Sequence, residues 1–167
     1  MKPRLRSLVL GGVGINCQEE LAQSYENIGI ETKVVHLQDL LSCRVKLKDY
    51  DIFSIPGGFS FGDELGAGKA LANRIRYFKR EDGTYLLDEL TDFIKEKGFV
   101  LGICNGFQAL VCLGLLPGLK LGEEPEVSLI GNQSGKFIDR WVYLKSEGGS
   151  PGPFSDKRLW NVPIRHK

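Results

Sequence analysis

Short runs of apolar and β-branched residues alternate along the chain with longer stretches in which apolar side chains recur every three or four positions. The short runs predict four strands, at 5–10, 32–37, 51–55 and 99–103. The amphipathic stretches predict helices at 16–28, 86–97 and 106–114. Strands that alternate with helices in this way build βαβ units. We therefore predict a three-layer α/β domain with a mostly parallel, open sheet and helices on both faces.

The alternation fades after Gly114. Runs at 127–130 and 137–144 favour strands of an antiparallel appendage, and 161–167 indicates one more strand that the chain end cuts short. In the first helix, Asn16 is a good N-cap residue and Gly29 stands where a C-terminal cap is expected. We treat residues 1–167 as a single domain, because this length suits one hydrophobic core.

Composition narrows the classes of function. The 22 basic and 21 acidic residues give a net charge of +1, so nothing suggests the basic surface of a nucleic-acid or membrane binder. The apolar run near the N-terminus is too short for a signal peptide, which predicts a cytoplasmic protein. The 4 cysteines form no C-x-x-C pair, which argues against a metal site. Cys17 and Cys112 are expected to be buried structural residues.

The stretch G-I-C-N-G-F-Q at 102–108 lies between a predicted strand and a predicted helix. A nucleophile on such a sharp turn needs glycine on both sides, because a bulky side chain two residues away would clash. The pattern therefore predicts that Cys104 is a nucleophile above a helix N-terminus, where the backbone N–H of Asn105 can stabilise an oxyanion. The alternative is a buried cysteine in a tight turn.

A second glycine-rich stretch, I-P-G-G-F-S-F-G-D-E-L-G-A-G-K, covers 55–69 and also follows a strand. It does not match a phosphate-binding P-loop, because Asp63 and Ala70 stand where glycine and Ser or Thr are required. The backbone N–H groups of Gly57 and Gly58 are instead suited to an oxyanion hole facing the thiol. A turn without chemistry is the alternative.

Together, P-G-G-F-S-F-G-D-E-L-G-A-G and G-I-C-N-G-F-Q resemble the glutaminase part of phosphoribosylformylglycinamidine synthase, a class I, triad-type glutamine amidotransferase of purine biosynthesis. N-Q-S-G-K-F-I-D-R-W-V at 132–142 and P-I-R-H at 163–166 also resemble segments of that family. The resemblance extends over nearly the whole chain. It implies a flavodoxin-like, three-layer fold.

The resemblance also implies the roles of individual residues. Cys104 would form a glutamyl thioester, Gly57, Gly58 and Asn105 would form the oxyanion hole, and Gln108 would contact glutamine. Ammonia would pass to a synthetase subunit, with a small bridging subunit as a further partner. ATP and Mg²⁺ would bind to that synthetase, so no cofactor or metal is expected in this chain.

The sequence departs from the family at its end. The triad histidine and glutamate of the family lie in a P-H-P-E segment, and the chain stops at Lys167 before any such segment. His166 matches the P-I-x-H stretch instead, and His36 is typical of a strand end.

Three interpretations stay open. The chain is part of a complete glutaminase, the one we favour, or an inactive glutamine-binding or regulatory subunit. The third is another cysteine-elbow protein: a protease, deglycase or redox sensor. Whether the enzyme is one long chain or separate subunits is also open.

Overall fold

The computed structural model describes residues 4–117, 124–143 and 165–166. These residues fall into two compact units, Met1–Leu129 and Ile130–Lys167, which are described separately. The strands of the first unit are β1 (Arg6–Gly11), β2 (Glu31–His36), β3 (Ile52–Ile55) and β4 (Phe99–Gly102). Its α-helices are α1 (Gln18–Asn27), α2 (Leu37–Leu41), α3 (Lys69–Tyr77), α4 (Leu86–Lys95) and α5 (Asn105–Cys112). Its described residues also form two 3-10 helices, η1 (Leu47–Asp49) and η2 (Ser60–Asp63).

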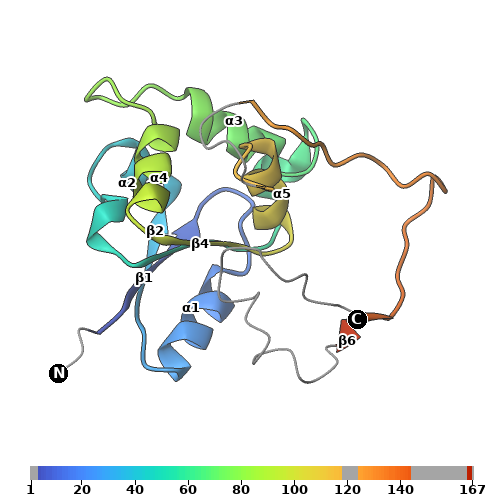
Figure 1. Cartoon of the computed structure of the whole chain (residues 1–167), viewed down its shortest axis with the longest axis horizontal. Coiled ribbons are helices and arrows are strands. Elements are labelled where there is room, and N and C mark those ends of the chain that lie inside the picture. The colour runs from blue at the N-terminus through green and yellow to red at the C-terminus, as the bar shows by residue number, and fades with distance from the viewer. Residues whose placement is uncertain (1–3, 118–123, 144–164, 167) are drawn as a thin grey trace. The chain divides into compact units, whose positions relative to one another are not determined.

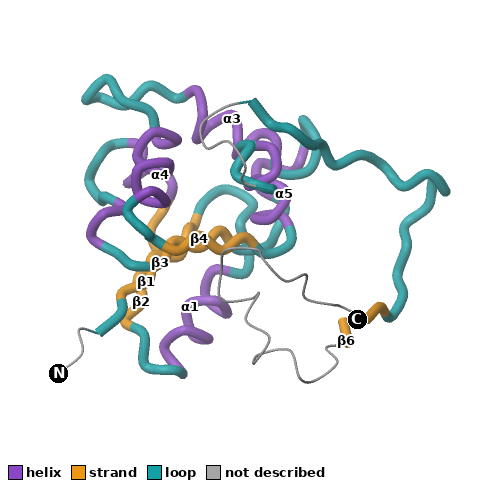
Figure 2. Tube along the Cα trace, viewed as in Figure 1, coloured by secondary structure: helices purple, strands orange, loops and turns teal. Residues whose placement is uncertain are grey.

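The four strands form one parallel sheet in the order β2-β1-β3-β4 (Figure 2). All four predicted strands are confirmed, each within one residue at either end. Because the strands are parallel, their carboxyl ends lie along one edge of the sheet. The chain leaves β1 toward β2 on one side and later toward β3 on the other, so the order of connections reverses between β1 and β3. In open α/β sheets, ligands bind at such a switch point.

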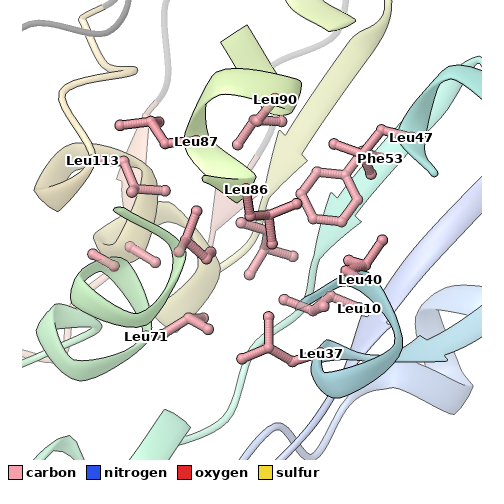
Figure 3. Close-up of a cluster of buried hydrophobic side chains, with 14 of the residues drawn as sticks. Leu10, Leu37, Leu40, Leu47, Phe53, Leu71, Leu86, Leu87, Leu90 and Leu113 are labelled. Atoms are coloured by element: carbon pink, nitrogen blue, oxygen red, sulfur yellow. The ribbon is translucent and has the colours of Figure 1, made fainter. Parts of the chain in front are cut away.

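Helices cover both faces of this sheet, as predicted. Figure 1 shows α1 on one face and α2, α3, α4 and α5 on the other. The Tyr25 hydroxyl of α1 lies 2.8 Å from the Ser54 hydroxyl of β3. This hydrogen bond fixes α1 to one face of the sheet. On the opposite face, side chains of β1 and β3 pack with those helices into one apolar core (Figure 3). Its fully buried members include Leu10, Phe53, Leu71 and Leu90.

The capping residues predicted for the two ends of α1 are only partly correct. The N-cap residue is Cys17, without a side-chain cap hydrogen bond, so the prediction of Asn16 as the cap is wrong. The C-terminal prediction is confirmed: Gly29 has φ +83°, and the N–H groups of Gly29 and Ile30 donate to Glu26 and Tyr25. A left-handed residue at this position is what a Schellman cap requires, and glycine adopts it at least cost.

The second unit contains one short antiparallel pair, β5 (Val142–Tyr143) with β6 (Arg165–His166). The predicted antiparallel appendage is therefore confirmed at 142–143, and the predicted last strand at 165–166. The prediction of a strand is wrong for 137–141, because these residues form no ladder. Residues 144, 161–164 and 167 lie outside the described part of the chain. The prediction of a strand at 127–130 is wrong, because these residues form no ladder. A short apolar run predicts a strand only where a partner strand can bond to it.

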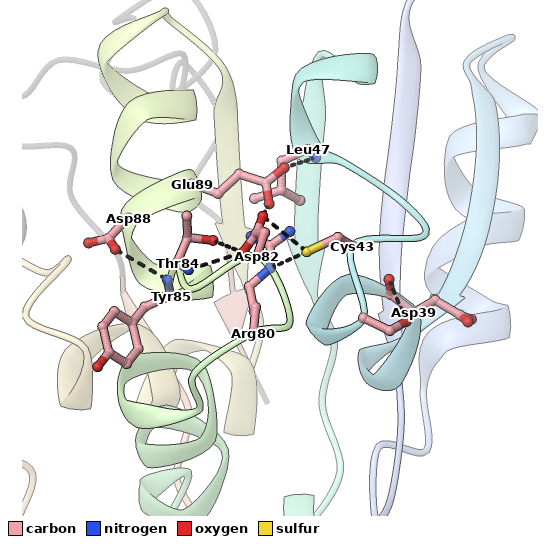
Figure 4. A network of polar contacts seen from close by, with 10 residues as sticks. Asp39, Cys43, Leu47, Arg80, Asp82, Thr84, Tyr85, Asp88 and Glu89 are labelled. Carbon is pink, nitrogen blue, oxygen red and sulfur yellow. Dashed lines mark hydrogen bonds and ion pairs between the residues drawn. The ribbon is translucent and has the colours of Figure 1, made fainter.

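A polar network joins the segment after α2 to α4 (Figure 4). Arg80 donates to Glu89 at 2.6 Å and to the Cys43 sulfur at 3.0 Å. The second carboxylate oxygen of Glu89 accepts from the backbone N–H of Leu47 at 2.6 Å. The Arg80 side chain is only 3% exposed, so its charge depends on Glu89 for compensation.

Replacing Arg80 by methionine would leave Glu89 half-buried without its cation. We expect Arg80→Met to lower the free energy of unfolding by about 3 kcal/mol, measured by urea denaturation. The matched control is Arg44→Met, since the Arg44–Asp39 pair spans 3.4 Å and its arginine is 73% exposed. That variant should lose less than about 1 kcal/mol. Equal losses in the two variants would contradict a structural role for the Arg80 network.

Candidate functional site

Three turns at the carboxyl edge of the sheet come together near the switch point. They follow β1, β3 and β4 and contain residues 12–17, 56–59 and 103–104. The turns after β1 and β3 are joined by an isolated antiparallel bridge between Ile15 and Gly58. The turn after β4 continues the sheet by one hydrogen bond, from Ile103 N–H to the Ile55 carbonyl at 3.1 Å.

Cys104 lies at the sharpest point of this edge, between β4 and α5. Its backbone has φ 53° and ψ −111°, a conformation that non-glycine residues seldom adopt. Gly106 N–H donates to the Ile103 carbonyl at 2.9 Å and Gln108 N–H to the Cys104 carbonyl at 3.1 Å, so the turn is held on both sides. The thiol-bearing residue is exposed. The geometry is that of a nucleophile elbow, as the sequence predicts.

The two glycines of the elbow are required by close approach. A methyl group on Gly102 would lie 2.8 Å from the backbone of Gly106 and 2.6 Å from Leu110. A methyl group on Gly106 would overlap the Ile55 carbonyl oxygen at the end of β3. The sequence prediction that both positions must be glycine is thus confirmed in physical terms. The helix of the elbow packs directly on the neighbouring strand end.

The Gly57-Gly58 turn lies beside Cys104. A methyl group on Gly57 would be 3.4 Å from Cys104 Cβ. Phe59 N–H donates to Gly14 at 2.7 Å and Asn16 N–H to Gly57 at 3.2 Å, on either side of the Ile15–Gly58 pair. In such a pair the two residues do not bond to each other, so the Gly58 N–H points away from Ile15. Gly58 also has φ +136°, which side-chain-bearing residues rarely adopt.

The side chain of Asn105 joins the elbow to this second loop. Its amide oxygen accepts from the Ser60 N–H at 3.0 Å and from the Ser60 hydroxyl at 2.6 Å. Its NH₂ group lies 3.0 Å and 3.2 Å from the two carboxylate oxygens of Asp63, and 3.1 Å from the amide oxygen of Gln108. Asn105 and Ser60 are both buried. The sequence alone gave no role to Ser60 or Asp63, although both stand in the G-G-F-S-F-G-D motif.

Three of the remaining predictions can be compared with the structure. Cys17 is exposed, so the expectation of burial is wrong; its sulfur lies 3.8 Å from a methyl group placed on Gly57. Cys17 is the N-cap residue of α1 and lies in the turn after β1, at the carboxyl ends of the strands. Cys112 is half-buried and packs against the core, and burial raises the pKa of its thiol. His36 caps α2, accepting from the Gln38 N–H through Nδ1, which fits a strand-end residue.

Other classes of site are not apparent in the described part of the chain. No group of three or more His, Cys, Asp or Glu side chains in residues 4–117, 124–143 and 165–166 is arranged to hold a metal ion. None of the helices described is long and apolar enough to traverse a bilayer. The side chain of His166 lies outside the description, although its backbone pairs with Val142.

Comparison with known proteins identifies the family. Residues 4–166 match the model of the CobB/CobQ-like glutamine amidotransferase domain. The chain belongs to this family. A Methanococcus maripaludis (strain DSM 14266 / S2) relative is a phosphoribosylformylglycinamidine synthase subunit PurQ, 41% identical over 162 residues. A Dehalococcoides mccartyi subunit PurQ is 41% identical over 166 residues.

The solved structure of PurLQS from Thermotoga maritima contains a chain with the same fold. It superposes with a TM-score of 0.70 at 31% identity and covers 98% of this chain. The resemblance drawn from the two motifs is therefore confirmed. The chain spans 56% and 61% of the length of the two PurQ relatives and 65% of the Thermotoga chain.

The contact between Gly106 and β3 can be tested by a single methyl group. We expect Gly106→Ala to lower the free energy of unfolding by more than about 2 kcal/mol, because neither backbone segment can move without breaking the sheet. The matched control is Gly131→Ala, since a methyl group there has no neighbour within 4 Å. Urea denaturation should find the control within about 0.5 kcal/mol of the native protein. If the free energy of unfolding of Gly106→Ala were as close to the native value as that of the control, the close contact between Gly106 and Ile55 would be contradicted.

Proposed function

We propose that this chain is the glutaminase component of phosphoribosylformylglycinamidine synthase. The observation that carries the proposal is the strained Cys104 elbow, packed beside the Gly57-Gly58 turn in a family of glutamine amidotransferases. An inactive glutamine-binding subunit is the weaker alternative, because strain at a nucleophile is costly to keep without a reaction to serve. Family membership over residues 4–166 disfavours a protease, deglycase or redox sensor.

The proposed reaction begins at the side-chain amide of glutamine. The Cys104 sulfur attacks the amide carbon, and the carbonyl oxygen becomes an oxyanion that the N–H groups of Gly58 and Asn105 stabilise. Asn105 is the first residue of α5, where backbone N–H groups lack helical acceptors, so its N–H is available. Collapse of the intermediate breaks the C–N bond and leaves a glutamyl thioester. Water then releases glutamate and restores the thiol.

The departing nitrogen needs a proton to leave as ammonia. In the family the triad histidine and glutamate of the P-H-P-E segment serve this step, and no stretch of residues 1–167 matches that segment. His36 is committed to capping α2, so we assign it no part in the reaction.

The proposed partners follow from the relatives. The Thermotoga chain was solved in a PurLQS structure. We propose that this chain likewise delivers ammonia to a synthetase subunit, with a small bridging subunit, in the cytoplasm. ATP and Mg²⁺ would bind to the synthetase, in line with the glycine-rich loop at 55–69 that lacks the P-loop pattern.

The proposal predicts that glutamine hydrolysis depends on one sulfur atom. With the synthetase partner present, Cys104→Ala should reduce ammonia release from glutamine at least about 10³-fold, because the proposed thioester forms on the Cys104 sulfur. Cys17→Ser is the matched control, since it changes another exposed thiol beside the same turn. We expect it to stay within about threefold of the native rate. Absence of ammonia release from the native protein, or equal rates in native and Cys104→Ala proteins, would contradict the proposal.

A further inference from the structure

We propose that Asp63 is a positioning residue for glutamine. Through the Asn105 amide it holds the loop at 56–63, called the oxyanion loop below, against the elbow, and it orients Gln108 as a hydrogen-bond donor to the substrate. The inference rests on the proposed glutaminase function and adds a role for a residue that does not itself touch the reacting atoms. It is carried by four hydrogen-bonded side chains, those of Ser60, Asp63, Asn105 and Gln108.

The orientation of the Asn105 amide follows from its partners. The Ser60 backbone N–H, 3.0 Å away, can only donate, so the atom of Asn105 facing it must be the oxygen. The NH₂ group consequently faces the Asp63 carboxylate and the Gln108 amide. A carboxylate can only accept, which requires the same orientation independently. Both the oxygen and the NH₂ group of the buried Asn105 amide thus have hydrogen-bond partners. A flipped amide would leave buried donors and acceptors unpaired.

The same contacts fix Gln108. One of the two N–H bonds of Asn105 is directed at Asp63, which leaves the other for the Gln108 amide oxygen at 3.1 Å. The Gln108 oxygen is therefore turned toward Asn105 and its NH₂ group away from it. Glutamine as a substrate presents carboxylate and carbonyl oxygens, which are acceptors. Gln108 would meet these oxygens as a donor, whereas a reversed amide would offer an oxygen and could bind only the α-ammonium or amide NH₂ group of glutamine.

Asp63 also holds a strained segment of the oxyanion loop. Phe61, Gly62 and Asp63 have φ values of 55°, 69° and 52°, three consecutive left-handed residues. Such a run is unfavourable for non-glycine residues and persists only where surrounding contacts determine it. Backbone bonds from the Phe61 N–H to Val13 and from the Gly62 N–H to Phe59 supply part of these contacts. The Asp63 carboxylate adds the others, accepting from the Gly68 N–H at 3.0 Å as well as from Asn105. Ser60, at the start of this segment, is bonded to Asn105 and lies two residues from Gly58.

The test compares Asp63→Ala with Asp63→Asn. Asparagine can keep the one oxygen that accepts from both Gly68 and Asn105, whereas alanine removes it. The asparagine NH₂ group would replace the second carboxylate oxygen, 3.2 Å from the Asn105 NH₂ group, so a small residual loss is expected. The probe is a chloromethyl ketone analogue of glutamine, which labels Cys104 without needing a general acid. Its rate is measured on the peptide containing Cys104 by mass spectrometry. Iodoacetamide, which does not use the glutamine site, is run in parallel on the same peptide.

We expect Asp63→Ala to lower the second-order rate of ketone labelling about tenfold or more, with iodoacetamide labelling within about twofold of native. Asp63→Asn should recover the ketone rate to within about threefold of native. Ketone labelling of Asp63→Ala within twofold of native would overturn the inference. A parallel loss with iodoacetamide would also overturn it, since that marks general damage to the elbow.

Two further measurements keep the test decisive. If the native protein is not labelled by the ketone, or glutamine does not protect it, the proposed function fails before any variant is compared. If Asp63→Ala shows no cooperative thermal unfolding, Asp63→Glu replaces it, because the added methylene displaces the carboxylate without removing its charge. The same tenfold loss is then expected, and a rate within twofold of native overturns the inference.

Discussion

The buried amide of Asn105 is the interaction on which the arrangement of the site depends. It lies one residue beyond Cys104, and its hydrogen bonds reach Ser60 in the loop that follows β3. Two strand ends that the sheet merely brings side by side are thereby fixed to each other through side chains. The last inter-strand hydrogen bond between these two segments runs from the Ile103 N–H to the Ile55 carbonyl, so beyond it the two loops need side-chain contacts to stay together. Both Cys104 and the Gly58 N–H depend on that link for their relative positions.

Close backbone packing sets the second constraint. Gly106 rests on the Ile55 carbonyl and Gly58 on the turn after β1, so the elbow, the oxyanion loop and the first turn share one compact edge. The core beneath them, formed by β1, β3 and the helices α2 to α5, gives that edge a rigid base. The strain at Cys104, and in the left-handed run from Phe61 to Asp63, is therefore supported by neighbouring contacts.

Sequence patterns with a direct physical cause were sufficient for much of this fold and site. Apolar runs predicted the four strands, and two glycines around Cys104 predicted the elbow, because sterics leaves few alternatives there. The failures concern partners that local sequence does not specify. Asn16 has a capping side chain but stands one residue too early, and 127–130 has strand-like residues without a partner strand. Ser60 and Asp63 acquire their roles only through Asn105, some forty residues away, which no periodicity reveals.

The most direct test of this account is a crystal structure of the protein with the glutamine chloromethyl ketone bound to Cys104. The account predicts that the ketone-derived oxygen lies about 2.7–3.1 Å from the backbone nitrogens of both Gly58 and Asn105, the range expected for oxyanion donors. It also predicts that the Gln108 NH₂ group faces the ligand. An oxygen directed into solvent, or bonded to neither nitrogen, would contradict the assignment of this edge as a glutaminase site.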